Sequence, residues 1–299
     1  MNAPHTPSNP TSHSLEGWTW HGRLFAAKSP VRVVVAFHGF GRPTEEMGNY
    51  LPLYPEGTTM LTVGIAHQNG STVPAFRDTP PVLEPTLMLQ ALDGWLDELG
   101  LSHLPKHLLG YSLGGRISLT LFEQAPMAWS GMVLLAADGF KKNAMYRFAV
   151  DTALGRACWA FVDRHAASVR RVIRGLRRLR IIPAHLEHFA LHHTEDHAMR
   201  QLVAHTWKTH RLFWPTRQRT SKAWQTLPER GVHVHAIFGS RDAIIPWDWS
   251  KPWHGLGNQH VHFARVDSGH VMRHPETVEA LRSLILPTSD ECVPPSTLA

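Results

Sequence analysis

Short apolar runs rich in β-branched residues recur along the chain, and stretches with a helical spacing of apolar positions separate them. Each run is long enough for a strand that is buried on both faces, and the runs are 31–37, 59–65, 107–111, 131–137, 232–238 and 260–266. The helical segments repeat apolar residues every three or four positions, and they are 84–99, 114–124 and 275–285. Strands that alternate with helices predict an α/β fold with a doubly wound, mostly parallel sheet.

The alternation is interrupted between about residues 140 and 228, where long helical stretches rich in Arg, His and Trp replace the strands. An insertion between two strands of a sheet is typical of a cap, so we expect a basic helical cap over 141–227. The core then comprises 17–140 and 228–287. We expect residues 1–16 to form a disordered leader and the Pro/Ser/Thr-rich residues 288–299 to form a tail.

The composition is that of a globular protein. Of 299 residues, 43% are hydrophobic and 18% are charged, which excludes a disordered, a collagen-like or a disulfide-framework chain. The two cysteines, Cys158 and Cys292, are too few for a small secreted protein held together by disulfides, and they favour a reducing compartment, the cytoplasm. The N-terminus lacks the pattern of a secretory signal, and the longest apolar runs are well under the roughly 20 residues that cross a bilayer.

The charge is distributed unevenly along the sequence. Residues 141–224 hold 17 Lys and Arg against 5 Asp and Glu, a net charge of +12, whereas the rest of the chain holds 13 and 19, a net of −6. Within this segment, residues 164–180 place valines, isoleucine and leucines on one side of a helical wheel and five arginines on the other. Three interpretations stay open: an exposed face of a packed cap helix, contact with anionic membrane lipid at the inner face of the membrane, or steering of an acidic substrate. Nucleic acid is the partner that we least expect.

The strongest chemical signal follows the run at 107–111. There the sequence Gly110-Tyr111-Ser112-Leu113-Gly114 lies between an apolar strand and a helix, which is the context of the GxSxG nucleophile elbow. The glycines remove side chains that would collide in a tight, strained turn. Ser112 is therefore the predicted nucleophile, and the backbone N–H of Leu113, at the start of the helix, is a predicted donor to an oxyanion.

Other strand ends offer the partners that a serine nucleophile needs. The run 31–37 leads into His38-Gly39-Phe40-Gly41, which makes the N–H of Phe40 the second predicted oxyanion donor and His38 a structural partner of that loop. His270 follows the last strand and is the predicted general base.

The acid that orients His270 has more than one candidate. Asp242 follows the run at 232–238 and is the preferred one, while Asp138 at the end of an earlier strand is the alternative. Asp267 is too near His270 in sequence to be the choice. The order Ser112, Asp242, His270 along the chain is that of enzymes with a nucleophile elbow, and it differs from the order in the two common serine protease folds.

With HGFG, GYSLGG, GSRD and DSGH in this order, the chain resembles the α/β-hydrolase superfamily over roughly 17–140 and 228–287. GYSLGGR, which includes Arg116, is also similar to the menaquinone-pathway lyases of the same fold. The chain departs from a DxPGxG-type loop that many relatives carry, because it has residues 65–71, IAHQNGS, at that place.

The resemblance and the motifs together predict a serine hydrolase that cleaves a carboxylic ester, for example a lysophospholipid or a monoglyceride, without a cofactor. A lyase or C–C hydrolase acting on an anionic ring compound, and a non-catalytic binding module, are the alternatives. Tryptophans of the cap and its return are expected to pack there and to line a pocket for an acyl chain or an aromatic group: Trp207, Trp214, Trp224, Trp247, Trp249 and Trp253. Seven histidines lie between 185 and 210, with His193 and His197 spaced as helical metal ligands are, but no metal site is expected.

Overall fold

The computed structural model describes residues 8–142, 146, 148, 152–179, 181–183, 187 and 197–286. Eight strands form one sheet in the order β1-β2-β4-β3-β5-β6-β7-β8. Their bounds are β1 Asn9–Leu15, β2 Trp18–Phe25, β3 Arg32–Phe37, β4 Thr58–Val63, β5 Lys106–Tyr111, β6 Gly131–Leu135, β7 Val234–Gly239 and β8 Val261–Val266. From β4 to β8 every pairing is parallel, and β1 and β2 join antiparallel, so the predicted mostly parallel α/β sheet is confirmed.

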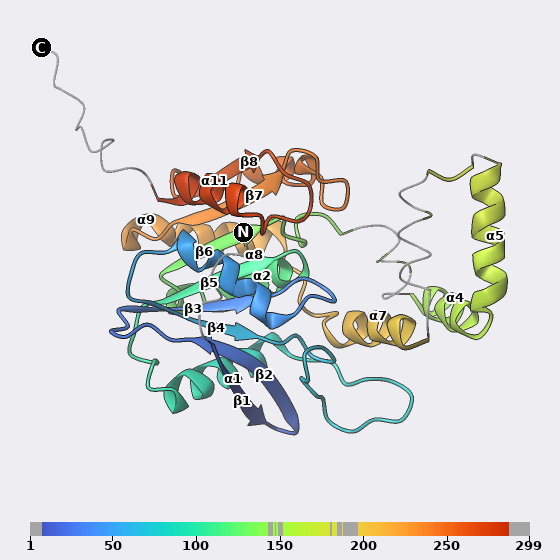
Figure 1. Cartoon of the computed structure of the whole chain (residues 1–299), viewed down its shortest axis with the longest axis horizontal. Coiled ribbons are helices and arrows are strands. Elements are labelled where there is room, and N and C mark those ends of the chain that lie inside the picture. The colour runs from blue at the N-terminus through green and yellow to red at the C-terminus, as the bar shows by residue number, and fades with distance from the viewer. Residues whose placement is uncertain are drawn as a thin grey trace, which may run out of the picture.

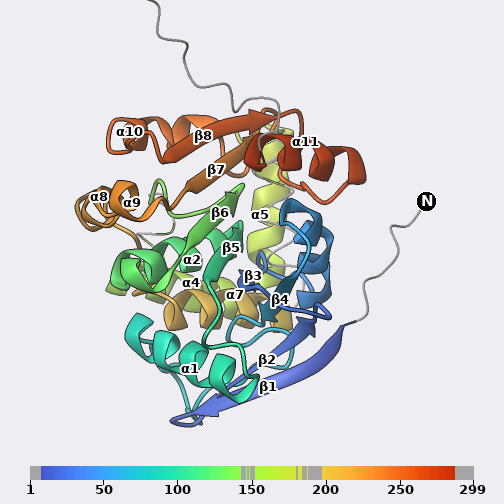
Figure 2. The ribbon, with the colours of Figure 1, turned by 90° about the vertical axis from the view of Figure 1, so that its left-hand side faces the viewer.

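Helices cover both faces of the sheet. The helices of the described residues are η1 Thr44–Leu53, α1 Pro85–Glu98, α2 Leu113–Gln124, η2 Pro126–Ala128, α4 Ala153–Arg164, α5 Ala166–Arg178, α7 His197–Thr209, α8 Arg217–Gln225, α9 Leu227–Arg230, η4 Trp247–Trp249, α10 Lys251–His254 and α11 Pro275–Ile285. On one face α1, α2 and α8 bury the core that contains Trp95, Ile117 and Trp224. On the other face η1 and α11 bury the core that contains Tyr50 and Leu281. Figure 2 shows α1, α2 and α8 on one side of the sheet and α11 on the other.

The alternation of side chains along the strands produces these two cores. In β3, Val33, Val35 and Phe37 face the α1 and α2 side, while Val34 and Ala36 face η1 and α11. All five are fully buried. A parallel strand that is covered on both faces must be apolar at successive positions, which is why the sequence shows continuous runs here.

The predicted disordered leader is wrong from residue 9 onward, whereas residues 1–7 lie outside the described residues. Residues 9–15 form the edge strand β1, which a two-residue turn at Glu16 and Gly17, both with positive φ, joins to β2. The Nε1–H of Trp95 in α1 donates to the Thr11 hydroxyl at 3.1 Å, and His13 Nδ1 lies 2.9 Å from Glu98. A polar edge strand of this kind has few apolar residues, so composition alone resembled that of a disordered segment.

The segment between β6 and β7, where we expected the cap, divides in two. In Figure 1, α4 and α5 project away from the sheet, and α7 lies between them and the body of the molecule. By contrast α8 packs on α2 and buries Trp224 in the main core, and Arg219 forms an ion pair with Glu123 at 2.7 Å. The expected tail, 288–299, lies outside the described residues. Among the helices of the described residues, none combines the length and the apolar character needed to cross a membrane.

Candidate active site

The parallel strands β3, β5, β7 and β8 all end at one edge of the sheet, and this edge brings the predicted catalytic residues together. Ser112 follows β5, Asp242 follows β7 and His270 follows β8. His270 Nε2 lies 3.0 Å from Ser112 Oγ, and His270 Nδ1 lies 2.8 Å from Asp242 Oδ2. Three side chains that are remote in sequence thus form one hydrogen-bonded chain.

Ser112 occupies a strained turn between β5 and α2. Its φ is 52° and its ψ is −116°, a backbone conformation with positive φ that residues other than glycine seldom adopt. A Cβ on Gly110 would lie 2.5 Å from the carbonyl oxygen of Gly114, and one on Gly114 would lie 2.1 Å from that of Phe37. Both glycines are therefore needed for the strand and the helix to approach so closely, as the GxSxG pattern predicts.

Asp242 is held in a fixed orientation beside the histidine. It is only 6% exposed, and its Oδ1 accepts hydrogen bonds from the backbone N–H groups of Ile244 and Ile245 at 2.8 and 2.9 Å. A carboxylate is an acceptor, so the ring of His270 donates from Nδ1. Its Nε2 is then free of a proton and can accept from the Ser112 hydroxyl.

The other two acid candidates do not contact His270. Asp138 pairs with Arg116 at 3.3 Å, and its Oδ1 accepts from the N–H of Gly139 at 2.7 Å. Asp267 is 82% exposed in its side chain and lies 3.4 Å from Arg241. Of the three candidates, the structure brings Asp242 alone to the histidine ring.

A cavity of about 390 Å³ opens above Ser112 and His270. Phe40 and Leu113, the predicted sources of the oxyanion donors, both line it. Leu113 is the first residue of α2, and the N–H groups of a first helical turn have no acceptor within the helix. The remaining walls are mostly apolar, with Arg42 and Asp138 as the charged residues.

Helix α7, from the segment expected to be the cap, supplies part of the cavity wall through Met199, Val203 and Trp207. Of the tryptophans expected near the pocket, Trp207 lines it, whereas Trp224 and Trp253 are buried in the main core. Arg116, the last residue of the GYSLGGR motif, is 1% exposed and is not among the residues that line the cavity. Its guanidinium lies over the rings of Tyr146 and Trp214, at 5.0 and 4.7 Å from their centroids.

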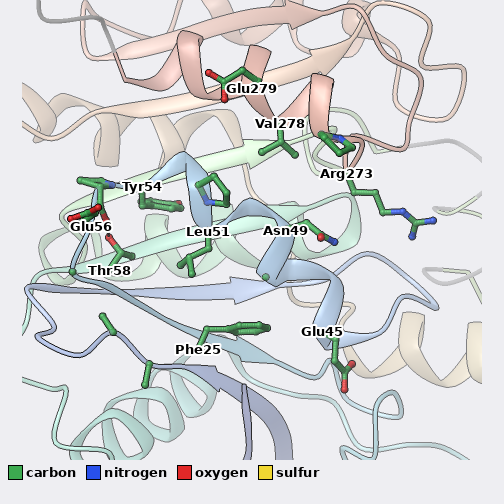
Figure 3. A pocket seen from close by; sticks show the side chains of 17 residues that line it. Phe25, Glu45, Asn49, Leu51, Tyr54, Glu56, Thr58, Arg273, Val278 and Glu279 are labelled. Atoms are coloured by element: carbon green, nitrogen blue, oxygen red, sulfur yellow. Dashed lines mark hydrogen bonds between the residues drawn. The ribbon is translucent and has the colours of Figure 1, made fainter. Parts of the chain in front are cut away.

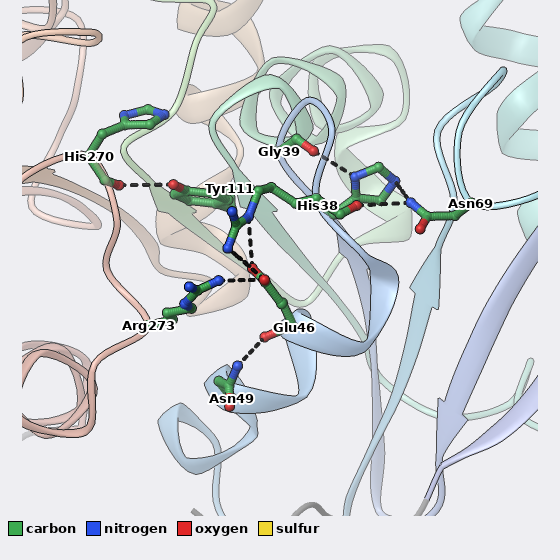
Figure 4. Close-up of polar contacts among 9 residues, drawn as sticks. His38, Gly39, Glu46, Asn49, Asn69, Tyr111, His270 and Arg273 are labelled. Carbon is green, nitrogen blue, oxygen red and sulfur yellow. Dashed lines mark hydrogen bonds and ion pairs between the residues drawn. The ribbon is translucent and has the colours of Figure 1, made fainter. Parts of the chain in front are cut away.

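The loop after β3 is braced by His38, which the sequence predicted as its structural partner, and by Gln68 and Asn69, which sequence reasoning missed. The ring of His38 donates from Nδ1 to the Gly39 carbonyl at 2.7 Å, and its Nε2 accepts from the amide of Asn69 at 2.9 Å (Figure 4). The same Nε2 also accepts from the N–H of Ile65 at 3.0 Å. Complete burial lowers the pKa of His38 to about 4, so the ring is neutral, as these bonds require. Gln68 adds a bond of 2.7 Å from the Gly41 N–H. The signal for Gln68 and Asn69 was the departure from the family pattern at 65–71.

The backbone of His270 is also held. The Tyr111 hydroxyl donates to the His270 carbonyl at 3.0 Å (Figure 4), and burial raises the pKa of Tyr111 to about 12, which keeps the donor protonated. Tyr111 directly precedes Ser112, so one side chain links the turn at Ser112 to the histidine loop, residues 267–274 between β8 and α11. In a GxSxG motif the second position varies in identity, so sequence alone gave no reason to select it.

A larger cavity, of about 610 Å³, lies between η1 and α11 (Figure 3). Phe25, Leu51, Tyr54 and Val278 are among its apolar lining residues, and Glu45, Glu56, Arg273 and Glu279 are its charged ones. None of the predicted site residues lines it, so the smaller cavity is the candidate active site.

The histidines between 185 and 210 do not form a metal site among the residues that the structure describes. His197 is the first residue of α7, and His210 is buried. The ring centroid of His205 lies 5.4 Å from that of His67. The other four lie outside the described residues: His185, His188, His192 and His193. Within the described ranges, no group of three or more His, Cys, Asp or Glu side chains could hold a metal ion.

No family model and no curated protein sequence matches the chain. Solved structures do. A carboxylesterase from Bacillus subtilis is 16% identical, with a TM-score of 0.60, over 94% of this chain and 92% of the other. The thioesterase domain from the curacin biosynthetic pathway is 13% identical, with a TM-score of 0.58, over 94% and 99%. A haloalkane dehalogenase from Bradyrhizobium elkani is 16% identical, with a TM-score of 0.58, over 93% and 98%. At these identities the likeness establishes the architecture alone: the chain has the α/β-hydrolase fold.

Proposed function

We propose that the protein is a serine hydrolase that cleaves a carboxylic ester through an acyl-enzyme formed on Ser112. The observation that carries this proposal is the hydrogen-bonded chain from Asp242 through His270 to Ser112, set at the wall of a cavity. A buried acid, an imidazole and a hydroxyl in this order are the components that make serine nucleophilic at neutral pH. Esterases and thioesterases among the solved structures with this fold add support.

In the first half of the reaction, Ser112 Oγ attacks the ester carbonyl while His270 Nε2 takes the hydroxyl proton. The imidazolium that forms is stabilised by Asp242, whose carboxylate is already oriented by two backbone N–H groups. The N–H groups of Leu113 and Phe40 receive the developing oxyanion. His270 then gives its proton to the leaving alcohol, and an acyl group remains on Ser112.

In the second half, a water molecule takes the position of the alcohol. His270 removes a proton from this water as it attacks the acyl carbonyl, and the acid product leaves when Ser112 regains its proton. The fixed N–H donors stabilise both tetrahedral intermediates, and loss of one such donor costs on the order of 100- to 1000-fold in turnover in well-studied enzymes.

The cavity walls favour an apolar acyl group. Phe40, Val203, Ile244 and Ile245 surround the space beside Ser112, and α7 closes one side of it. Apolar walls with a few polar groups bind by removing apolar surface of the ligand from water.

A fluorophosphonate probe tests the proposal directly, because it reacts with a serine that a histidine has activated. We expect wild-type protein to be labelled at Ser112, as mapped by mass spectrometry of the tryptic peptide. Ser112→Ala and His270→Ala should abolish labelling, whereas Ser102→Ala, a change of a partly exposed serine between α1 and β5, should not alter it. Wild-type protein that stays unlabelled would refute the mechanism.

A second experiment separates the two alternatives raised by the sequence. A p-nitrophenyl ester should leave an acyl group on Ser112 in an early burst, which mass spectrometry detects as an added mass. A lyase mechanism without a stable acyl intermediate predicts no such adduct, and a binding module predicts neither an adduct nor turnover.

We further propose that α5 contacts anionic membrane lipid. The helix carries Arg171, Arg174 and Arg178 as exposed residues on its basic side. On the opposite side, Val172 and Leu179 are 61% and 71% exposed, and α5 projects from the body of the molecule (Figure 1). Apolar residues in water on one face and arginines on the other are the arrangement of a helix that lies in a bilayer interface.

Vesicle flotation tests this contact with the full chain. Near an anionic surface each basic residue contributes about 1 kcal/mol, so Arg174→Gln together with Arg178→Gln should weaken binding to vesicles containing phosphatidylserine roughly 30-fold. The matched control is Arg217→Gln with Lys222→Gln, two exposed basic residues of α8. Equal binding to neutral vesicles, or an equal loss in the control, would exclude a role for the charge of α5.

A further inference from the structure

One carboxylate lies between the two loops that carry the proposed catalytic groups. Glu46, in η1, forms a two-point ion pair with Arg42: its Oε2 accepts from Arg42 Nε at 2.9 Å, and its Oε1 lies 2.6 Å from Arg42 Nη2. The same Oε1 also accepts from Arg273 Nη1 (Figure 4). Glu46 therefore holds two guanidinium groups at once.

The two arginines belong to different parts of the site. Arg42 ends the loop that follows β3, two residues after Phe40, and its own backbone is tied to that loop because its N–H donates to the Gly39 carbonyl at 3.1 Å. Arg273 lies three residues after His270, in the segment that leads from β8 to α11. The ion pairs of Glu46 thus join the oxyanion loop, residues 38–42 after β3, to the histidine loop, residues 267–274 between β8 and α11.

Each loop also has its own anchors. The Asn69 amide donates to the Arg42 carbonyl at 2.9 Å, and the Ser268 hydroxyl donates to the Val271 carbonyl at 3.0 Å. The first bond ties the loop after β3 to the loop after β4, and the second lies within the loop after β8. They do not set the spacing between the loops, which is the distance that matters when an oxyanion donor and a general base must act on the same carbonyl group.

We propose that Glu46 is a positioning residue that fixes the distance between the oxyanion loop and the histidine loop. The inference rests on the proposed ester hydrolysis. In a well-oriented site a misplacement of about 1 Å can lower the rate 100-fold. Because Glu46 contacts neither the cavity nor Ser112, its loss should impair turnover and leave ground-state binding of substrate nearly intact.

Glu46→Gln keeps the size of the side chain and removes the charge that attracts both arginines. The matched control is Glu45→Gln, the same change at the preceding residue of η1, whose carboxylate is half-exposed and lies 3.3 Å from Arg23. Hydrolysis of a p-nitrophenyl ester is measured per active site titrated with fluorophosphonate, so protein that has not folded does not count. We expect Glu46→Gln to lower kcat roughly tenfold with KM changed less than about twofold. Glu45→Gln should match the wild type.

Arg273→Gln provides a second variant and a test of the coupling. If Glu46 acts through Arg273, then Arg273→Gln should lower kcat in the wild-type background and should add little in the Glu46→Gln background. The inference is overturned if Glu46→Gln has no larger effect on kcat than Glu45→Gln, if its effect falls on KM alone, or if the effects of Glu46→Gln and Arg273→Gln simply multiply. Failure of the proposed function would differ, because wild-type protein would then be neither labelled nor active.

Discussion

Asp242→Asn is the substitution that tests the proposed triad most sharply. Asparagine keeps a carbonyl oxygen, which can still accept from the N–H groups of Ile244 and Ile245, as Asp242 Oδ1 does. It places an NH2 group where Oδ2 now faces His270 Nδ1 at 2.8 Å. Two donors cannot face each other, so the ring must carry its proton on Nε2, and that nitrogen can no longer accept the proton of Ser112.

The expected loss is large because the wrong tautomer removes the general base. A change of this kind lowers kcat about 10⁴-fold in a serine protease, which corresponds to about 5.5 kcal/mol in the activation barrier. Stability should change little, because the two backbone bonds persist and the side-chain volume is nearly the same. A fall in kcat without a fall in the melting temperature is therefore the expected signature.

The assay is hydrolysis of a p-nitrophenyl ester by purified protein, with thermal unfolding measured on the same samples. Asp267→Asn is the control, because that exposed carboxylate follows β8 without touching the ring. Its kcat should stay within about twofold of the wild-type value, as for surface changes away from a site. Activity of Asp242→Asn within tenfold of the wild type, or a larger loss in Asp138→Asn, would refute the assignment of the acid.

Two further predictions concern stability. A Cβ at Gly114 would lie 2.1 Å from the Phe37 carbonyl oxygen, so Gly114→Ala should lower the free energy of unfolding in urea by at least about 1–3 kcal/mol. The control is Gly255→Ala, which should not destabilise the protein because no atom lies within 4 Å of the added carbon. Equal effects of the two substitutions would contradict the packing argument. The pKa of His38 is lowered from 6.5 to about 4 by burial, so the unfolded chain binds the proton more readily, and the stabilisation present above pH 6.5 should be lost as the pH falls toward 4. This group alone contributes roughly 1.4 kcal/mol per pH unit in that range, so an unfolding free energy that is the same at pH 7 and pH 5 would show that the buried ring is not the titrating group we infer.

The sequence by itself determined most of the sheet and the residues that meet at its edge. Runs rich in apolar residues identified β3 to β8. In β3, which is covered on both faces, Val33 to Phe37 are all apolar for that reason, whereas the edge strand β8 also exposes His262 and Arg265. Ser112 and His270 could be selected because the chemistry of each requires a particular turn at a strand end. The β1–β2 hairpin was missed, since an edge strand exposes polar side chains and does not differ in composition from a leader.

The tertiary structure alone decided which groups act on one another. Asp242 and Asp138 both follow strands, and only folding shows that one reaches His270 and the other pairs with Arg116. Glu46 belongs to no motif, because its significance comes from two arginines that are 227 and 4 residues away in sequence. Ion pairs between loops depend on the distances between side chains in the folded protein, and a pattern along the sequence does not specify those distances.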